Sequence, residues 1–318
     1  MRIAGKPPDE RWVSSAARTG GTGMTDDKRA RSIVDELIEE RAPGLFGNVF
    51  GRSFMRTVLY PLLHYRHALE LAEIVRDLSA HEIFEFVSRM LSIDVRVDGL
   101  SHVPPDGAVL IAPNHPTGIA DGFVVYDALK TLRPDMCFFA NRDALRVAPR
   151  LEEMIIPVEW SRDKKSHASA RDTLVAAAKA LRDQRCVVLF PAGRLAYMSL
   201  TGLHERPWQA TIVNLAKRFD APIVPMSLTG RNSALFYAFS KVSNELRDVT
   251  LFREFLNKRS YAYRVRIAAA IPPDALEGDP QEFAEDLQYL VEHAMPQQGP
   301  VARLRRRPRP RPATLWGN

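Results

Sequence analysis

The 318-residue sequence has only two cysteines and no group of histidine, cysteine and acidic residues at metal-ligand spacing. Cys137 and Cys186 both lie in apolar runs, which is typical of buried thiols in a reducing compartment. A disulfide framework and a metal site are therefore not expected. We expect no resident cofactor.

Long hydrophobic stretches are also missing. No apolar run reaches the roughly 18 residues that a membrane-spanning helix needs. Residues 1–23 are rich in Gly, Ser, Pro and charge and lack the apolar core of a signal peptide, so we expect a disordered leader there. If the protein meets a membrane, we expect it to lie on the surface.

Three well-known motifs are absent from the sequence. A Ser-His-Asp hydrolase would need a Gly-x-Ser-x-Gly elbow, and none is present. Neither a Gly-x4-Gly-Lys-Ser/Thr loop nor a Gly-x-Gly-x-x-Gly turn is found, which excludes the common nucleotide-binding sites.

The net charge of +6 is concentrated in residues 299–318, which contain six arginines and no acidic residue. Proline alternates with arginine over residues 307–312, so we expect 299–318 to be a disordered tail. The tail could hold the protein against an anionic membrane, or simply keep it soluble. We expect no nucleic-acid binding, because no aromatic residues are interleaved for base stacking.

Residues 24–92 have helical periodicity, with predicted helices over 25–41 and 66–92. Residues 45–63 between them are rich in Phe and Leu and are broken by Gly and Pro. This composition suits a membrane-interfacial segment. It suits equally well a helical lid that packs on the protein's own core.

From residue 93 onward, predicted strands alternate with predicted helices. The strands are 93–97, 108–112, 136–140, 154–158, 186–190, 222–228 and 265–270, and the helices are 123–130, 166–183, 211–218 and 280–295. This order predicts an α/β domain over residues 93–298, with a mostly parallel central sheet covered by helices on both faces. The N-terminal helical segment would precede it.

A polar turn, Asn114-His115-Pro-Thr-Gly-Ile-Ala-Asp121, follows the strand 108–112. Ligands bind at the carboxyl ends of strands in open α/β sheets. A neutral imidazole suits general-base chemistry near pH 7, and a carboxylate on its other nitrogen fixes the tautomer. We therefore predict that His115 takes a proton from a hydroxyl and that Asp121 orients it. The alternative is a capping Asp beside a turn His.

Two further loops also follow strands. Phe190-Pro-Ala-Gly193-Arg194 follows one strand, and Trp160-Ser-Arg162-Asp follows another. Gly193 would let backbone N–H groups approach an oxyanion or phosphate, and an arginine is a planar cationic partner for either. Because parallel strands end at one edge, both loops can face the same crevice as the His turn. Each loop alone is also typical of an ordinary strand-to-helix turn.

These three loops and Ala221-Pro-Ile-Val-Pro225 occur in the order of the four sequence blocks of the glycerolipid acyltransferase (lysophosphatidic acid acyltransferase-like) family. The chain resembles that family over residues 90–270. Residues 229–236 and 256–259 resemble its bacterial hemolysin-like or ornithine-lipid-type branch.

The resemblance implies that His115, oriented by Asp121, is the base for the hydroxyl of a lyso-lipid of the 1-acylglycerol-3-phosphate or lyso-ornithine-lipid type. The acyl donor would be acyl-CoA or acyl-carrier protein. The substrate contacts implied are Asn114, Arg162, Gly193 and Arg194. The resemblance also implies a cytoplasmic enzyme that is peripheral on the inner face of the cell membrane.

Two positions depart from the family pattern. The usual His-x4-Asp is His-x5-Asp here, and the usual Phe-Pro-Glu-Gly-Thr-Arg is Phe-Pro-Ala-Gly-Arg-Leu. The second loop reads the acceptor in the family, so its change bears on acceptor identity. A non-catalytic lipid-binding module on the same fold is the alternative function, and it would not depend on His115.

Overall fold

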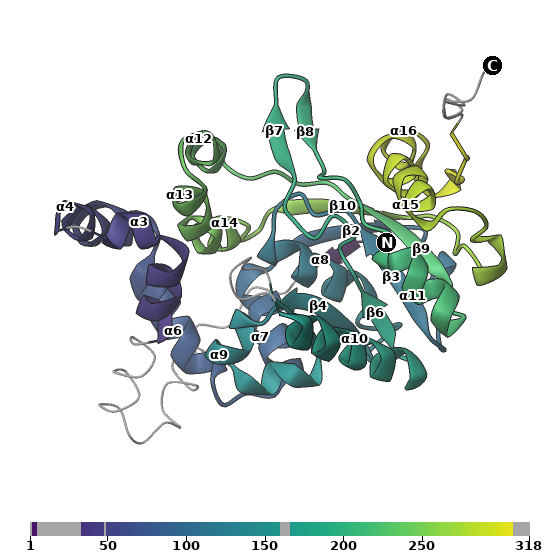
Figure 1. Cartoon of the computed structure of the whole chain (residues 1–318), viewed down its shortest axis with the longest axis horizontal. Helices are drawn as coiled ribbons and strands as arrows, with labels where there is room; N and C mark the ends of the chain where they lie inside the picture. Colours follow the sequence, from purple (N-terminus) through teal and green to yellow (C-terminus); the bar gives the residue numbers. More distant parts are fainter. Residues whose placement is uncertain (1, 5–32, 48, 160–165, 308–318) are drawn as a thin grey trace, which may run out of the picture.

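The computed structural model describes residues 2–4, 33–47, 49–159 and 166–307. Its centre is an eight-stranded sheet of order β1-β2-β10-β9-β3-β6-β4-β5 (Figure 1). The strands are β1 Arg2–Ala4, β2 Asp94–Asp98, β3 Val109–Pro113, β4 Cys137–Asn141, β5 Ile155–Val158, β6 Cys186–Val188, β9 Ile223–Leu228 and β10 Ala262–Ile267. Only the β1–β2 and β9–β10 pairs are antiparallel, so the predicted mostly parallel sheet is confirmed.

Helices cover both faces of the sheet, as predicted. Helices α7 (Ala80–Leu91), α8 (Ile119–Leu129) and α14 (Leu251–Leu256) pack on one face, and α10 (His167–Arg182), α11 (Thr211–Phe219) and α15 (Pro280–Tyr289) pack on the other. Along β3, Ile111 faces the first layer, while Leu110 and Ala112 face the second. A strand buried on both faces reads as a continuous apolar run, which explains why the sequence revealed it.

The N-terminal segment is a series of short helices beside this domain. After helical residues 33–41 come α3 Pro43–Phe46, α4 Val49–Phe54, a π-helical turn Met55–Leu59, α5 Tyr60–Leu62 and α6 Tyr65–Val75. Met55, Leu59 and Leu63 are buried against Val249. Val49 and Phe50 point outward, with 79% and 88% of their surface exposed. Residues 45–63 therefore have both a side packed on the protein and an exposed apolar side.

The predicted helix 66–92 is two helices, α6 and α7. Ser79 begins the second one: its hydroxyl accepts a hydrogen bond from the backbone N–H of Glu82, whose carboxylate accepts one from the backbone N–H of Ser79. Such a capping box starts a new helix. Val87 and Leu91 of α7 join the core of the sheet. Residue 92, the predicted domain boundary, therefore separates no packing units.

Parts of the expected leader and of the expected tail contact the α/β domain. Residues 2–4 of the expected leader pair antiparallel with residues 94–96; most of the leader lies outside the described residues. In the expected tail, Arg306 and Arg307 each place Nε 3.1 Å from a carboxylate oxygen of Asp286 on α15. Arg306 and Arg307 therefore pack on the domain, because Asp286 is a buried carboxylate that these guanidinium groups neutralise. Residues 308–318 lie outside the described part.

A β-hairpin that the sequence did not predict lies between β6 and α11. It consists of β7 Tyr197–Ser199 and β8 Gly202–His204 and stands away from the sheet (Figure 1). Helices α12 Ala234–Val242 and α13 Asn244–Val249 follow β9 and pack against the N-terminal helices, whereas α14 packs on the sheet face that α8 covers. Within the described residues, no helix combines the length and apolarity needed to cross a bilayer.

Candidate active site

The predicted His–Asp pair forms at the carboxyl end of β3. The imidazole Nδ1 of His115 lies 2.9 Å from Oδ2 of Asp121. Helix α8 begins at Ile119, not at residue 123 as predicted, so Asp121 lies in its first turn. The loop from Pro113 to Gly118 turns back over this helix end and brings the ring to the carboxylate. A loop was expected to bring His115 and Asp121 together. The helix nevertheless begins four residues earlier than the sequence predicted.

Asp121 is fully buried and accepts hydrogen bonds at both oxygens. Its Oδ2 accepts from the backbone N–H groups of Thr117, at 2.8 Å, and Gly118, at 2.9 Å, as well as from His115. The hydroxyl of Thr117 donates to Oδ1. Four donors at a helix N-terminus fit an ionised carboxylate, which only accepts. His115 then carries its proton on Nδ1, and Nε2 keeps the lone pair that a base needs.

Tyr263 on β10 extends this chain of hydrogen bonds. Its hydroxyl lies 2.8 Å from the Thr117 hydroxyl. Because the single Thr117 hydrogen goes to Asp121, Tyr263 is the donor to Thr117. Burial, together with the charge of Asp121, raises the pKa of Tyr263, so this donor stays protonated. Sequence analysis missed both residues, since a turn threonine and an alternating strand tyrosine have no distinctive signal.

A buried carboxyl group, Glu205, holds the backbone of His115. Oε1 of Glu205 accepts from the His115 N–H at 2.9 Å, and the indole N–H of Trp208 reaches Oε2 at 3.4 Å. The carbonyl of His115 accepts from the N–H of Ala196 at 3.0 Å. Both backbone polar groups of His115 are thus satisfied. Burial raises the pKa of Glu205 to about 8. No sequence motif marked this residue.

The ring of His115 also contacts Phe190, the first residue of the predicted Phe190–Arg194 loop. The ring centroids are 4.2 Å apart. The strand β6 and the loop after it therefore lie against the imidazole, as the parallel-sheet argument predicted. This contact restricts the rotation of the imidazole.

The other predicted site residues have different environments. The Asn114 amide bridges to the backbone of Leu228, with Nδ2 2.9 Å from its carbonyl and Oδ1 2.6 Å from its N–H. This favours a role in fastening the loop to β9 over the predicted substrate contact. Gly193 has a φ of +59°, a conformation that glycine adopts without strain, but its N–H donates to Phe190 at 2.9 Å. That N–H is therefore used within the turn.

Arg194 is exposed beside Gly193, and it has no acidic partner within the described part of the chain. A free guanidinium next to the imidazole loop can bind an anionic group of a substrate. Arg162, the second predicted arginine, lies outside the described residues.

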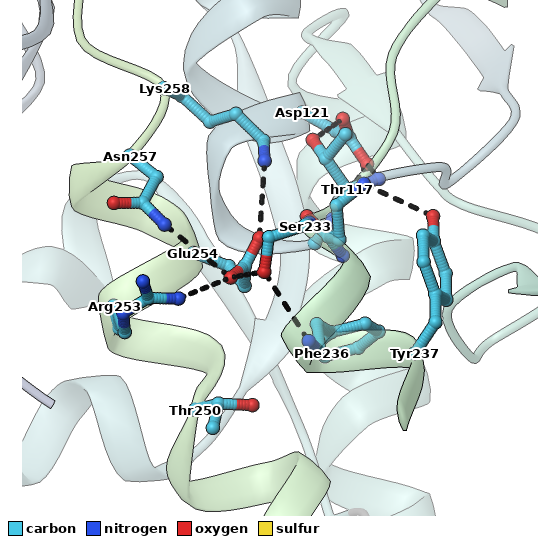
Figure 2. A network of polar contacts seen from close by, with 12 residues as sticks. Thr117, Asp121, Ser233, Phe236, Tyr237, Thr250, Arg253, Glu254, Asn257 and Lys258 are labelled. Atoms are coloured by element: carbon cyan, nitrogen blue, oxygen red, sulfur yellow. Dashed lines mark hydrogen bonds and ion pairs between the residues drawn. The ribbon is translucent and has the colours of Figure 1, made fainter. Parts of the chain in front are cut away.

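A second polar cluster supports the pair from the side of α12 and α14 (Figure 2). The fully buried Glu254 accepts from the N–H of Ser233 at 2.7 Å and from its hydroxyl at 2.6 Å, and Lys258 Nζ lies 3.5 Å away. Burial lowers the pKa of Lys258, while the charges of Glu254 and Asp121 oppose that shift. The cluster fixes the loop that follows β9. Ser233 and Lys258 come from the two segments that resemble the bacterial branch.

Glycine is required where this loop meets the site. A Cβ on Gly230 would lie 2.7 Å from the ring of Tyr263 and 2.8 Å from the methyl group of Thr117. No side chain larger than hydrogen fits there without displacing the two residues that support Asp121.

Comparison with known proteins finds acyltransferases. Residues 94–229 match the Acyltransferase family model, and this range contains both His115 and Asp121. A lyso-glycine lipid O-acyltransferase from Bacteroides thetaiotaomicron is 21% identical over 276 residues, covering 84% of this chain and 99% of its own length. A second lyso-glycine lipid O-acyltransferase, from Phocaeicola vulgatus, is 23% identical over 259 residues. The match covers 78% of this chain and 89% of that protein.

Among solved structures, the chain is similar to the 1-acyl-sn-glycerophosphate acyltransferase PlsC from Thermotoga maritima. It is 15% identical in sequence and aligns with a TM-score of 0.46, covering 84% of this chain and 96% of that chain.

Proposed function

We propose that this chain transfers a fatty acyl group to the hydroxyl of a lyso-lipid, with His115 as the general base, because residues 94–229 match the Acyltransferase family model and both relatives described above are lipid O-acyltransferases. The observation that carries the proposal is the 2.9 Å contact between His115 and the fully buried Asp121, whose four donors favour the ionised carboxylate. A capping aspartate would not need an imidazole as partner. The alternative, a non-catalytic lipid-binding module, leaves this pair unexplained.

The proposed reaction is a direct acyl transfer. The acceptor hydroxyl gives its proton to Nε2 of His115 while its oxygen attacks the thioester carbonyl carbon. The tetrahedral intermediate then collapses, the C–S bond breaks, and the thiolate takes the proton back from the imidazolium. An oxygen ester and a free thiol result. Asp121 stabilises the imidazolium during this cycle, as carboxylates do in related dyads.

We propose an amino-acid lyso-lipid as the acceptor, in preference to 1-acylglycerol-3-phosphate. Both curated relatives are lyso-glycine lipid O-acyltransferases. The changed loop supports the same choice, because Ala192 replaces the family glutamate and the arginine stands one position early, at Arg194. In this proposal Arg194 and Arg162 bind the anionic groups of the two substrates, which would be acyl-CoA or acyl-carrier protein and the lyso-lipid.

We further propose that the enzyme works at a membrane surface, on the inner face of the cell membrane, where these donors occur. The exposed Val49 and Phe50 of α4 would enter the headgroup region. In this arrangement the N-terminal helices dock the protein while the α/β domain carries the chemistry.

The test is an acylation assay with the purified full chain. Labelled acyl-CoA and acyl-carrier protein would each be offered with lyso-glycine lipid, lyso-ornithine lipid and 1-acylglycerol-3-phosphate. The proposal expects an ester product with an amino-acid lyso-lipid. Preference for the glycerol phosphate would contradict the acceptor assignment, and no product with any pair, in protein that still binds vesicles, would favour the lipid-binding module.

A further inference from the structure

The β7–β8 hairpin presents an apolar side chain at its tip. Leu200, in the turn between the two strands, is fully exposed. Val242 at the end of α12 is 76% exposed. In Figure 1 the hairpin tip, α12 and α4 lie along the same upper left side of the view. Exposed apolar residues gathered on one side of a molecule indicate an interaction surface.

The charge pattern of these segments identifies the partner. Residues 43–63, 194–204 and 234–242 contain no aspartate or glutamate, although the chain has 38 acidic residues. Within them lie Arg52, Arg194 and Lys241. Apolar tips with cations in the same segments match a bilayer that contains anionic lipids, which attracts basic residues near its surface.

The hairpin is a braced element. The guanidinium of Arg206 lies 4.5 Å from the ring centre of Tyr197 at its base. At the turn, the hydroxyl of Thr201 lies 2.8 Å from Nε2 of His204 and 2.9 Å from the hydroxyl of Ser199. A braced hairpin can hold Leu200 at a fixed height above the domain.

Both ends of the hairpin are fastened to the loop of the proposed base. Ala196, just before β7, donates its N–H to the carbonyl of His115, and Glu205, just after β8, accepts the N–H of His115. Leu195 packs over Gly118, where an added Cβ would come within 3.0 Å of it. The base of the hairpin and the loop of His115 are therefore joined on both sides.

We propose that Leu200 and the end of α12 form a second lipid contact, which sets His115 at the depth of the lyso-lipid hydroxyl. This inference rests on the proposed function and adds to the docking by α4. The partner is an anionic bilayer, and the hairpin is the element that joins that bilayer to the catalytic loop.

The test is binding of the full chain to mixed phosphatidylcholine–phosphatidylglycerol vesicles, measured by co-sedimentation. Leu200→Asp and Val242→Asp should each weaken binding about tenfold or more, because a carboxylate replaces a side chain that would be buried in the bilayer and is repelled by anionic headgroups. Leu174→Asp and Val175→Asp are matched controls. These residues are 51% and 60% exposed, and they lie on α10, away from the hairpin tip and α12 (Figure 1). Both controls should bind like the wild type.

A second measurement locates the tip directly. Leu200→Cys can be labelled with an environment-sensitive fluorophore, because Cys137 and Cys186 are buried. Its emission should shift to shorter wavelength with vesicles, whereas the same label at residue 174 should not shift. A label at residue 200 that stays in water, or Leu200→Asp binding as tightly as its controls, would overturn the inference.

The outcome is separable from that of the proposed function. Acyl transfer to a short-chain acceptor dissolved without vesicles should be unchanged in Leu200→Asp. If the wild type lacks this transfer but its vesicle binding still depends on Leu200, the proposed function fails and the lipid contact stands. If transfer occurs and binding ignores Leu200, the inference fails alone.

Discussion

Glu205 accepts a hydrogen bond from the backbone N–H of His115 at 2.9 Å, from a position 90 residues further along the chain. Only 7% of Glu205 is exposed. The group that orients the backbone of the proposed base is therefore a carboxyl shielded from solvent, and its removal should affect catalysis and stability in different ways.

Glu205→Ala should lower kcat about tenfold with little change in KM. The variant leaves a buried N–H without an acceptor, at a cost of roughly 1–3 kcal/mol, and frees the loop that carries His115. Glu205→Gln retains an acceptor oxygen and should keep most of the wild-type kcat. Steady-state kinetics of the three proteins checks this. An equal loss of kcat in both variants would mean that the carboxyl group of Glu205 acts through its charge and not through the hydrogen bond to His115.

Glu205 should also make folding pH-dependent. Burial raises the pKa of Glu205 from 4.5 to about 8 in the folded state. The stability that this group contributes is fully present below about pH 4.5 and is lost as the pH rises to about 8. Relative to the wild type, Glu205→Gln should therefore gain on the order of 3 kcal/mol in unfolding free energy between pH 5 and pH 9. Denaturant unfolding at both values measures it, and parallel changes in the two proteins would contradict it.

Asp121→Asn should reduce kcat on the order of 1,000-fold, because a neutral amide no longer fixes the Nδ1–H tautomer or stabilises the imidazolium. Binding of vesicles should be unchanged, which provides the control for folding. Single-turnover acyl transfer is the measurement. Activity within about threefold of the wild type would exclude Asp121 from the mechanism.

Tyr263→Phe should act more weakly on the same pair. It removes the hydroxyl that donates to Thr117 at 2.8 Å but keeps the buried ring. We expect a loss of about 1 kcal/mol in stability and a several-fold lower kcat. Tyr261→Phe is the matched control, because Tyr261 lies two residues earlier and its ring contacts that of Tyr263, whereas the hydrogen bond to Thr117 comes from Tyr263. A Tyr263→Phe enzyme with wild-type kcat would confine this residue to a packing role.

Gly230→Ala should be more damaging than its size suggests. The added methyl group would lie under 3 Å from both Tyr263 and Thr117, so these residues must move. Overpacking of this kind costs typically 1–3 kcal/mol, and the displacement should also lower kcat. Gly193→Ala faces open space and should lose stability only through its positive φ. Thermal unfolding and kinetics of both variants distinguish the two effects.

Most of the fold could be predicted from the sequence, because strands such as β3 and β9 are buried along their whole length and appear as largely apolar segments. The His115–Asp121 pair could be predicted because the two residues lie close together in the sequence, directly after a recognisable strand. Sequence periodicity found α10 and α11 as well, each with one buried face.

The supporting residues could not be predicted. Glu205 and Tyr263 reach the site from 90 and 146 residues away along the chain, and local patterns carry no information about such contacts. The hairpin was missed because its two strands have three residues each and do not alternate between buried and exposed positions. The contacts of Arg306 and Arg307 could not be predicted, because they depend on Asp286, a distant buried carboxylate.

The most direct test of this account is acyl transfer by His115→Ala. His293→Ala is the control, since this exposed histidine lies in the C-terminal helical region against Tyr289. The account predicts that His115→Ala loses product formation by at least a factor of about 1,000 and still binds vesicles, while His293→Ala keeps wild-type rates. Acyl transfer that persists in His115→Ala at a rate near the wild type would contradict the central claim.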